Sequence, residues 1–217
     1  MTAQELGFRH RFVPAAQDGP PVTLVLLHGT GGNEDDLLSL GRELAPGAAL
    51  LSPRGKVLEN GLPRFFRRLA EGIFDQQDLA LRTTELSKFV TAAKESYGIQ
   101  HHSTVAVGYS NGANIAASIL LSVPGIFDGA ALLRPMVPFV PFDPPRLDGV
   151  HVLLAAGERD PIVETGNTDL LTSILDSAGA DVKLHWHPGG HELGQDDLFA
   201  AKRWMDSWLL TGSKRTA

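Results

Sequence analysis

The chain has 217 residues, 43% hydrophobic and 20% charged, and this balance allows a sizeable buried core and excludes a disordered chain. The formal net charge of −6 argues against nucleic-acid binding, which usually needs a strongly basic domain, and the lack of cysteine excludes disulfides, thiolate metal sites and a cysteine nucleophile. Residues 1–17 lack a basic segment followed by an apolar one, and no apolar run could span a bilayer, so we expect a cytoplasmic protein without stable membrane association.

Short apolar runs alternate with helical patterns along the chain. Residues 6–15 predict an antiparallel edge strand, and the continuous apolar run of residues 21–29 is typical of a strand buried on both faces of a parallel sheet. Asn33 is expected to cap a helix that reaches Leu44, because the acidic residues after it favour the positive end of a helix dipole. Further strands are expected at residues 48–53, 103–109, 127–133, 149–157 and 180–187, and further helices at residues 79–98, 111–122, 162–178 and 192–210.

This alternation predicts an α/β fold in which helices cover both faces of a mostly parallel central sheet. No internal repeat, low-complexity tract or linker divides the chain, so residues 1–217 are expected to form a single domain. Residues 54–78 make the one irregular connection. A connection of this length is uncommon in a compact domain and is often functional.

A serine stands between two glycines where the strand of residues 103–109 meets the next helix. Residues 108–112 read GYSNG and match the G-x-S-x-G pattern of a nucleophile elbow, in which the serine occupies a strained turn. Glycines two residues to either side remove side chains that would clash in so tight a turn. The pattern alone is weak evidence for a nucleophile. The strand predicted before it and the helix predicted after it make Ser110 a candidate nucleophile.

A serine hydroxyl becomes an effective nucleophile only when a base takes its proton, so a histidine and a carboxylate should follow in the order Ser, Asp or Glu, His. Asp160 follows the predicted strand of residues 149–157, and His191 follows the last predicted strand. The order is therefore correct, with each residue after a different strand. Glu158 could replace Asp160, but it lies nearer the strand end and has a longer side chain, which favours Asp160.

The other histidines provide no comparable pattern. His185 and His187 alternate along a strand and share one face, but no third ligand has suitable spacing, so we expect no metal site. His101 and His102 precede a strand, at the wrong end of the sheet.

A tetrahedral intermediate needs hydrogen-bond donors for its oxyanion. The backbone amide of Asn111, directly after the candidate nucleophile, is one, and the second is expected from the glycine-rich residues 28–32 after the first buried strand. A dinucleotide site is the alternative for this turn. Glu34 stands where its third glycine should be, and no phosphate-binding lysine follows, so the turn is better suited to a single oxyanion.

Four segments together resemble the bacterial phospholipase/carboxylesterase family of α/β-hydrolases: HGTGGNEDDLL, GYSNGANIA, GERDPIV and PGGHEL. The resemblance spans nearly the whole chain, and PRGKVLENGLPRFFRRLAEGIFDQQDL is similar to a subgroup of carboxylesterases and hydroquinone-resistance hydrolases. It implies a catalytic triad of Ser110, Asp160 and His191, oxyanion-hole amides at Thr30 and Asn111, no large cap domain and no cofactor. Thr30 departs from the leucine that many relatives carry, a change that keeps the amide but alters the pocket nearby. Members of that family often form homodimers.

The substrate pocket is expected from the long connection and from the loop after residues 127–133. Phe65, Phe66 and Met136, with Phe139, could form an apolar acyl or alcohol site, although such residues are often buried for packing alone. A basic cluster in the same connection could attract an anionic substrate or form surface ion pairs; it consists of Arg64, Arg67 and Arg68.

These residues predict a serine carboxylesterase that hydrolyses small, short-chain carboxylic esters through an acyl-enzyme intermediate. An acyl-thioesterase or a lysophospholipase would use the same triad, because the triad determines the reaction and the pocket determines the substrate. A third alternative is a ligand-binding protein that has kept the fold without the chemistry. No member of the triad is missing, which argues against it.

Overall fold

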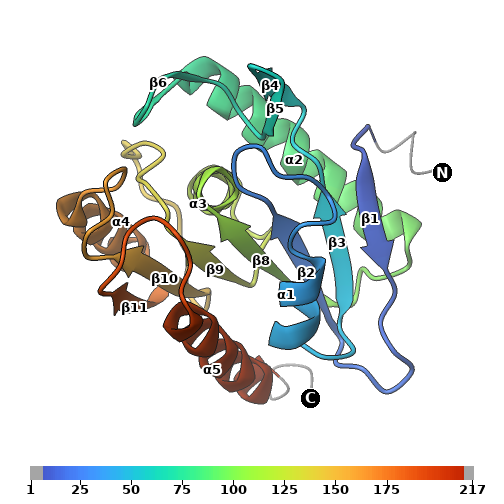
Figure 1. The fold of residues 1–217 in the computed structure, drawn as a ribbon. Helices are drawn as coiled ribbons and strands as arrows, with labels where there is room; N and C mark the ends of the chain where they lie inside the picture. The colour runs from blue at the N-terminus through green and yellow to red at the C-terminus, as the bar shows by residue number, and fades with distance from the viewer. Residues whose placement is uncertain (1–6, 213–217) are drawn as a thin grey trace.

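The computed structural model describes residues 7–212, and seven of their strands form one sheet (Figure 1). Across the sheet the strand order is β1-β3-β2-β8-β9-β10-β11, with β1 antiparallel to β3 and all other neighbours parallel. The bounds are His10–Val13 for β1, Val22–Leu27 for β2, Ala49–Pro53 for β3, Ser103–Tyr109 for β8, Gly129–Leu133 for β9, His151–Gly157 for β10 and Asp181–His187 for β11. The predicted α/β fold with an antiparallel edge strand is therefore confirmed.

Helices lie on both faces of this sheet because its central strands are apolar on both sides; every residue of β2 and β9 is buried. The helices are α1 (Leu38–Leu44), α2 (Gln76–Ser96), α3 (Asn111–Ser122), α4 (Thr165–Ser177) and α5 (Gln195–Gly212). One core cluster joins a sheet face to α2, α3 and α4, and a second joins the opposite face to α1 and α5. Within residues 7–212, none of the helices has the length and hydropathy needed to cross a bilayer.

Helix starts differ from those predicted because side chains build turns before several helices. The Asn33 side chain accepts a hydrogen bond from the Asp35 amide at 2.8 Å, and Asp36 accepts one from the Asn33 amide, so α1 begins only at Leu38. In α2 the cap is Asp75, which accepts the Asp78 amide, and the helix starts at Gln76. The helices α4 and α5 each begin three residues later than predicted.

The long connection is not irregular but contains two small hairpins. β4 (Val57–Glu59) pairs with β5 (Leu62–Arg64), and β6 (Arg68–Ala70) pairs with β7 (Ile73–Phe74). The first hairpin turns through Asn60 and Gly61, whose φ values of 52° and 81° are typical of a two-residue type I′ turn. Figure 1 shows these strands beside α2, above the sheet edge where β8 runs into α3.

Candidate active site

Ser110 lies in a sharp turn between β8 and α3, as the nucleophile-elbow motif predicts. Its φ of 51° and ψ of −113° are strained for a residue with a side chain, and its amide donates to the Leu133 carbonyl at 2.8 Å. A Cβ on Gly108 would lie 2.6 Å from the Gly112 carbonyl oxygen, and one on Gly112 only 2.0 Å from the Leu27 oxygen. Both glycines are therefore required by close backbone contacts around the serine.

The structure brings Ser110, His191 and Asp160 into one chain of hydrogen bonds. His191 Nε2 lies 2.9 Å from Ser110 Oγ, and Nδ1 lies 2.8 Å from Asp160 Oδ2. An ionised carboxylate only accepts hydrogen bonds, so the proton of a neutral imidazole belongs on Nδ1 and leaves Nε2 free to accept from the serine. This is the arrangement that a general base needs.

Asp160 is held from both sides. Its side chain is 1% exposed, and while Oδ2 faces His191, Oδ1 accepts the amides of Ile162 at 2.8 Å and Val163 at 3.1 Å. The competing carboxylate, Glu158, lies on an exposed residue two positions earlier. The structure therefore places Asp160, and not Glu158, against the histidine.

The two predicted oxyanion donors lie beside Ser110. Thr30 and Asn111 both line the same pocket as Ser110 and His191. Asn111 is the first residue of α3, so its amide has no partner within the helix. The neighbouring Gly31 amide is occupied by the Pro63 carbonyl at 2.9 Å, whereas within residues 7–212 no acceptor is found for the Thr30 or Asn111 amide. The two amides remain available to an anion at the positive end of the helix dipole.

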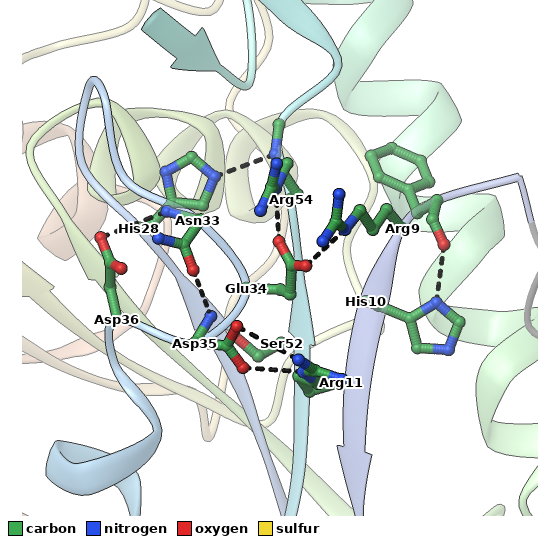
Figure 2. Close-up of polar contacts among 12 residues, drawn as sticks. Arg9, His10, Arg11, His28, Asn33, Glu34, Asp35, Asp36, Ser52 and Arg54 are labelled. Atoms are coloured by element: carbon green, nitrogen blue, oxygen red, sulfur yellow. Dashed lines mark hydrogen bonds and ion pairs between the residues drawn. The ribbon is translucent and has the colours of Figure 1, made fainter.

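A polar network missed in the sequence holds the turn that contains Thr30 (Figure 2). The buried Glu34 accepts hydrogen bonds from Arg9 Nε at 2.6 Å and from Arg54 Nε. Burial alone would raise the pKa of Glu34, but hydrogen bonds from its own amide, Arg54 and Arg9 lower it below its usual range. Ionised Glu34 thus holds residues 28–36 in place through its ion pairs. The sequence did not reveal this role, because Glu34 stands in an acidic run that is also typical of a helix N-terminus.

His28 fixes the start of the same turn. Its Nε2 accepts the Gly55 amide at 2.9 Å, so its Nδ1 carries the proton and donates to the Gly29 carbonyl at 2.7 Å. Burial lowers the pKa of His28, which keeps the ring neutral as this pair of hydrogen bonds requires. The imidazole therefore ties the turn after β2 to the start of residues 54–78.

A pocket of about 290 Å³ opens over Ser110. Met136 lines it as expected, but Phe65 and Phe66 do not; they are 2% and 0% exposed and belong to the core. The lining residues are Thr30, Arg64, Arg68, Glu71, Gly72, Phe74, Tyr109, Ser110, Asn111, Asn114, Met136, Ile162 and His191. Phe74 and Tyr109 are therefore the aromatic residues of the pocket wall, and Phe74 contacts Phe66 edge-on with ring centroids 5.0 Å apart.

Phe65 is held in the core by a backbone hydrogen bond and by packing of its ring. Its amide donates to the Asn111 side-chain oxygen at 2.7 Å, and its ring lies against His28 with centroids 4.7 Å apart. The expectation that Phe65 and Phe66 contact the substrate is therefore wrong. The segment between the two hairpins packs into the hydrophobic core.

The three arginines of the basic cluster have separate surroundings. Arg64 is 3% exposed and donates to the Thr30 hydroxyl at 2.7 Å, while Arg68 pairs with Glu59 at 2.8 Å. The same Glu59 lies 3.1 Å from Arg64 Nε. Arg67 is exposed and pairs with Asp75. Ion pairing thus offsets much of the positive charge beside the pocket.

Histidines 185 and 187 lie on β11 away from any cluster of metal-binding side chains; within the described part of the chain no group of three or more His, Cys, Asp or Glu residues could hold a metal ion. His187 Nδ1 accepts the Gly189 amide at 2.9 Å. It is therefore part of the turn that leads to His191.

A mostly parallel sheet with a strained serine at the end of β8, and with a carboxylate and a histidine after later strands, defines an α/β-hydrolase. Comparison with known proteins supports this assignment to the α/β-hydrolases. Residues 61–199 match the family model described as the dienelactone hydrolase family, and the chain belongs to that family. It is a hydrolase of the dienelactone hydrolase and carboxylesterase type, as the resemblance to carboxylesterase-like α/β-hydrolases implied.

Three relatives illustrate this similarity. The putative hydrolase MhqD of Bacillus subtilis is 48% identical over 181 residues, which cover 83% of this chain and 90% of MhqD. The crystal structure of the Bacillus cereus carboxylesterase is 46% identical, with a TM-score of 0.88 over 92% of this chain and 94% of that one. The carboxylesterase from Mesorhizobium loti is 32% identical, with a TM-score of 0.87 over 95% and 98% of the two chains.

Proposed function

We propose that the protein is a serine carboxylesterase that hydrolyses small, short-chain carboxylic esters through an acyl-enzyme intermediate. The observation that carries this proposal is the continuous hydrogen-bonded chain from Ser110 Oγ through the His191 ring to Asp160, with distances of 2.9 and 2.8 Å. The membership in a family of hydrolases and the carboxylesterases among the related structures support it.

In the first half of the reaction, Ser110 Oγ attacks the ester carbonyl carbon while His191 Nε2 takes the hydroxyl proton. The carbonyl oxygen becomes an oxyanion that accepts hydrogen bonds from the Thr30 and Asn111 amides. His191 then passes its proton to the alkoxide oxygen as the carbon–oxygen bond breaks, and the alcohol leaves. Asp160 keeps the ring oriented and stabilises its positive charge during this step.

In the second half, water attacks the acyl-serine with His191 as base, and the same amides hold the second oxyanion. The proton then returns from His191 to Ser110 Oγ, and the carboxylic acid is released. Every proton in this cycle moves through one imidazole nitrogen. No cofactor is required by these steps.

The size and polarity of the pocket favour short substrates. Its volume of about 290 Å³ is at the small end of ligand pockets, and arginine, glutamate and asparagine side chains interrupt its apolar lining. Phe74, Met136 and Ile162 provide the apolar surface. We infer that an acyl or alcohol group of a few carbons fills it.

A lysophospholipase or long-chain thioesterase is the second candidate, and one observation favours it. The hairpins of residues 57–74 carry exposed large apolar side chains, namely Leu58 (68% exposed), Leu62 (49%), Leu69 (70%) and Ile73 (56%). These residues could extend the apolar path of a long chain beyond the pocket. The two candidates differ in how kcat/KM depends on chain length.

The proposal is tested with a fluorophosphonate probe and p-nitrophenyl butyrate. The probe is expected to label one serine, and Ser110→Ala should remove both labelling and ester turnover while the protein stays folded by circular dichroism. A panel of esters, thioesters, lactones and lysophospholipids then compares the candidates. Turnover that survives in purified Ser110→Ala protein would contradict the assignment, and wild-type protein that binds but hydrolyses no member of the panel would favour a binding protein.

A further inference from the structure

Arg134 is a buried charged residue with a strained backbone. It lies between the turn that contains Ser110 and the loop that contains His191. It follows the last residue of β9, Leu133, whose carbonyl holds the Ser110 amide at 2.8 Å. Arg134 is 1% exposed and has a φ of 56°, in the left-handed region that residues with side chains rarely adopt. Such strain persists only where surrounding contacts enforce it, so the contacts of the guanidinium are informative.

The guanidinium of Arg134 grips the loop that carries His191. Nε donates to the Gly190 carbonyl at 2.9 Å, and Nη2 donates to the Glu192 carbonyl at 2.9 Å. These carbonyls belong to the residues on either side of His191. The carbonyl between them, that of His191 itself, accepts the Tyr109 hydroxyl at 3.2 Å. Three consecutive carbonyls of a turn are therefore held by side chains from the strand ends beneath it.

Asp197, in the first turn of α5, completes the arrangement. It forms a bidentate pair with Arg134, with distances of 2.9 and 2.7 Å, and both side chains are fully buried. The carboxylate also accepts the Gly194 amide at 2.8 Å. Burial alone would raise the pKa of Asp197, but the hydrogen bonds from Arg134 and from the Gly194 amide lower it below its usual range. The lowered pKa favours the ionised form of Asp197 opposite the guanidinium.

Glycines allow the loop before His191 to pack closely against the end of β10. A Cβ on Gly157 would lie 2.3 Å from the Gly190 carbonyl oxygen, so the strand end and the loop touch backbone to backbone. Three of residues 188–194 are glycines, so few side chains of the loop itself can fix it, and the donors to its carbonyls come from Arg134 and Tyr109. A buried ion pair is often no more stabilising than apolar residues of similar volume, so stability alone gives little reason for this one.

We propose that the buried Arg134–Asp197 pair is a positioning device for the proposed general base: it holds residues 190–194 so that the His191 ring spans Ser110 and Asp160. This inference rests on the proposed function. Neither residue lines the pocket, so both act through His191 and not on the substrate. Loss of the pair should therefore lower kcat and leave KM nearly unchanged.

Two variants separate this role from general stabilisation. Arg134→Met with Asp197→Asn removes both charges together, which avoids an unpaired buried charge, and the asparagine oxygen can still accept the Gly194 amide. Arg134→Lys keeps the charge opposite Asp197 but cannot reproduce the planar fork that reaches both carbonyls. The matched control is Lys202→Met with Asp206→Asn, which removes an exposed ion pair from the same helix.

The measurements are kcat and KM for p-nitrophenyl butyrate, the rate of fluorophosphonate labelling, the urea midpoint, and the downfield proton resonance of the His191–Asp160 hydrogen bond. We expect kcat to fall about 10²-fold in the double variant and about 10-fold in Arg134→Lys, since small misplacements of a reacting group carry penalties of this size. KM should stay within about twofold, the labelling rate should fall in parallel with kcat, and the downfield resonance should broaden or disappear. The control should match the wild type in all four.

Folded variants with wild-type kcat, or with a sharp downfield resonance and reduced activity, would overturn the positioning role. So would a loss that comes only from a smaller labelled fraction, with unchanged kcat for each labelled site. If the double variant does not fold, the same criteria apply to Arg134→Lys. Wild-type turnover that Ser110→Ala abolishes upholds the proposed function whatever these variants do, whereas a wild type without turnover would contradict both proposals.

Discussion

The sheet edge that carries the proposed triad and the segment of residues 54–78 that lines the pocket are built in different ways. Ser110, Asp160 and His191 each follow a strand of the central sheet and are fixed by hydrogen bonds that involve backbone groups near the strand ends. The wall segment consists of two short hairpins with exposed leucines, tied down by ion pairs at the surface.

Under the proposed function, this difference assigns reaction and selectivity to separable parts of the molecule. Displacing a group at the sheet edge alters the geometry of the reacting atoms, so it should act on kcat. Changing the wall segment or the residues that face it alters what the pocket accepts, so it should act on KM and on the order of preferred substrates. Each of the kinetic predictions below tests one side of this division, and the last prediction tests a contact that joins the two regions.

The largest effect is expected for Asp160→Asn. Because Oδ1 accepts two backbone amides, the asparagine oxygen will stay on that side and its NH₂ group will face His191 Nδ1. The ring is then forced into the tautomer with its proton on Nε2, which cannot accept from Ser110, and kcat should fall about 10⁴-fold. Steady-state kinetics with p-nitrophenyl butyrate check this.

Glu158→Gln is the matched control for that substitution, since it changes the neighbouring exposed carboxylate. It should leave kcat within about twofold of the wild type, as surface changes usually do. Equal losses in Asp160→Asn and Glu158→Gln would break the assignment of the carboxylate.

The next effect concerns the oxyanion amides. Thr30→Pro removes the N–H and should lower kcat about 10²- to 10³-fold, the usual range for loss of one such donor. Thr30→Ala keeps the amide and loses only the hydroxyl that accepts from Arg64, so its effect should be far smaller. Comparable losses in two folded variants would assign the contribution to the hydroxyl or the loop shape instead.

A smaller effect is expected when the pocket wall changes. For p-nitrophenyl esters, kcat/KM should peak between about two and six acyl carbons, since each buried methylene contributes about 0.8 kcal/mol only until the wall is reached. Met136→Ala should move this peak to longer chains by removing pocket-lining bulk. The series is measured below the micelle concentration of each ester.

Phe66→Leu is the control, because Phe66 lies in the core behind Phe74 and not on the pocket surface. It should lower the urea midpoint without moving the chain-length optimum. Values of kcat/KM that still rise at lauroyl or palmitoyl esters would instead favour the long-chain candidate and the exposed leucines as its binding path.

The smallest effect concerns the pH dependence of stability. Burial lowers the pKa of His28 from the ordinary value of 6.5, so the unfolded chain takes up a proton at a higher pH than the folded one does. The free energy of unfolding should therefore decrease as the pH falls below about 6.5. Urea titrations at pH 8, 6.5 and 5.5 measure the slope.

His28→Asn should be less stable than the wild type at pH 8 and should show a shallower decrease below pH 6.5. Part of the slope should remain, because burial also lowers the pKa of His185 and His102. An unchanged slope in His28→Asn would show that this ring does not contribute to the pH dependence.

The sheet and the order of the triad could be predicted from local patterns alone. The strands β2, β8 and β10 are mostly buried apolar runs, whereas β11 is only partly buried. Ser110 follows β8 directly, and Asp160 and His191 lie in the turns just after β10 and β11. Because parallel strands end at one edge of a sheet, their order in the chain was enough to bring the three residues together.

The pocket wall and the supporting network could not be predicted in this way. Which aromatic ring of residues 54–78 faces the pocket depends on where two short hairpins turn, so Phe74 was missed and Phe65 and Phe66 were misplaced. Arg134 is a lone basic residue after a strand, and its partner Asp197 is 63 residues away. Only the assembled sheet brings such residues into contact.

Asn111 links the two regions that the predictions treat as separate. It lines the pocket beside Ser110, while its side-chain oxygen accepts the Phe65 amide at the junction of the two hairpins. For protein engineering this makes the junction a fixed attachment point: hairpins exchanged between homologues can differ freely at their tips, but the graft must keep an amide donor in register with Asn111. Chimeras joined at residues 57 and 74 should retain turnover only when that register is preserved.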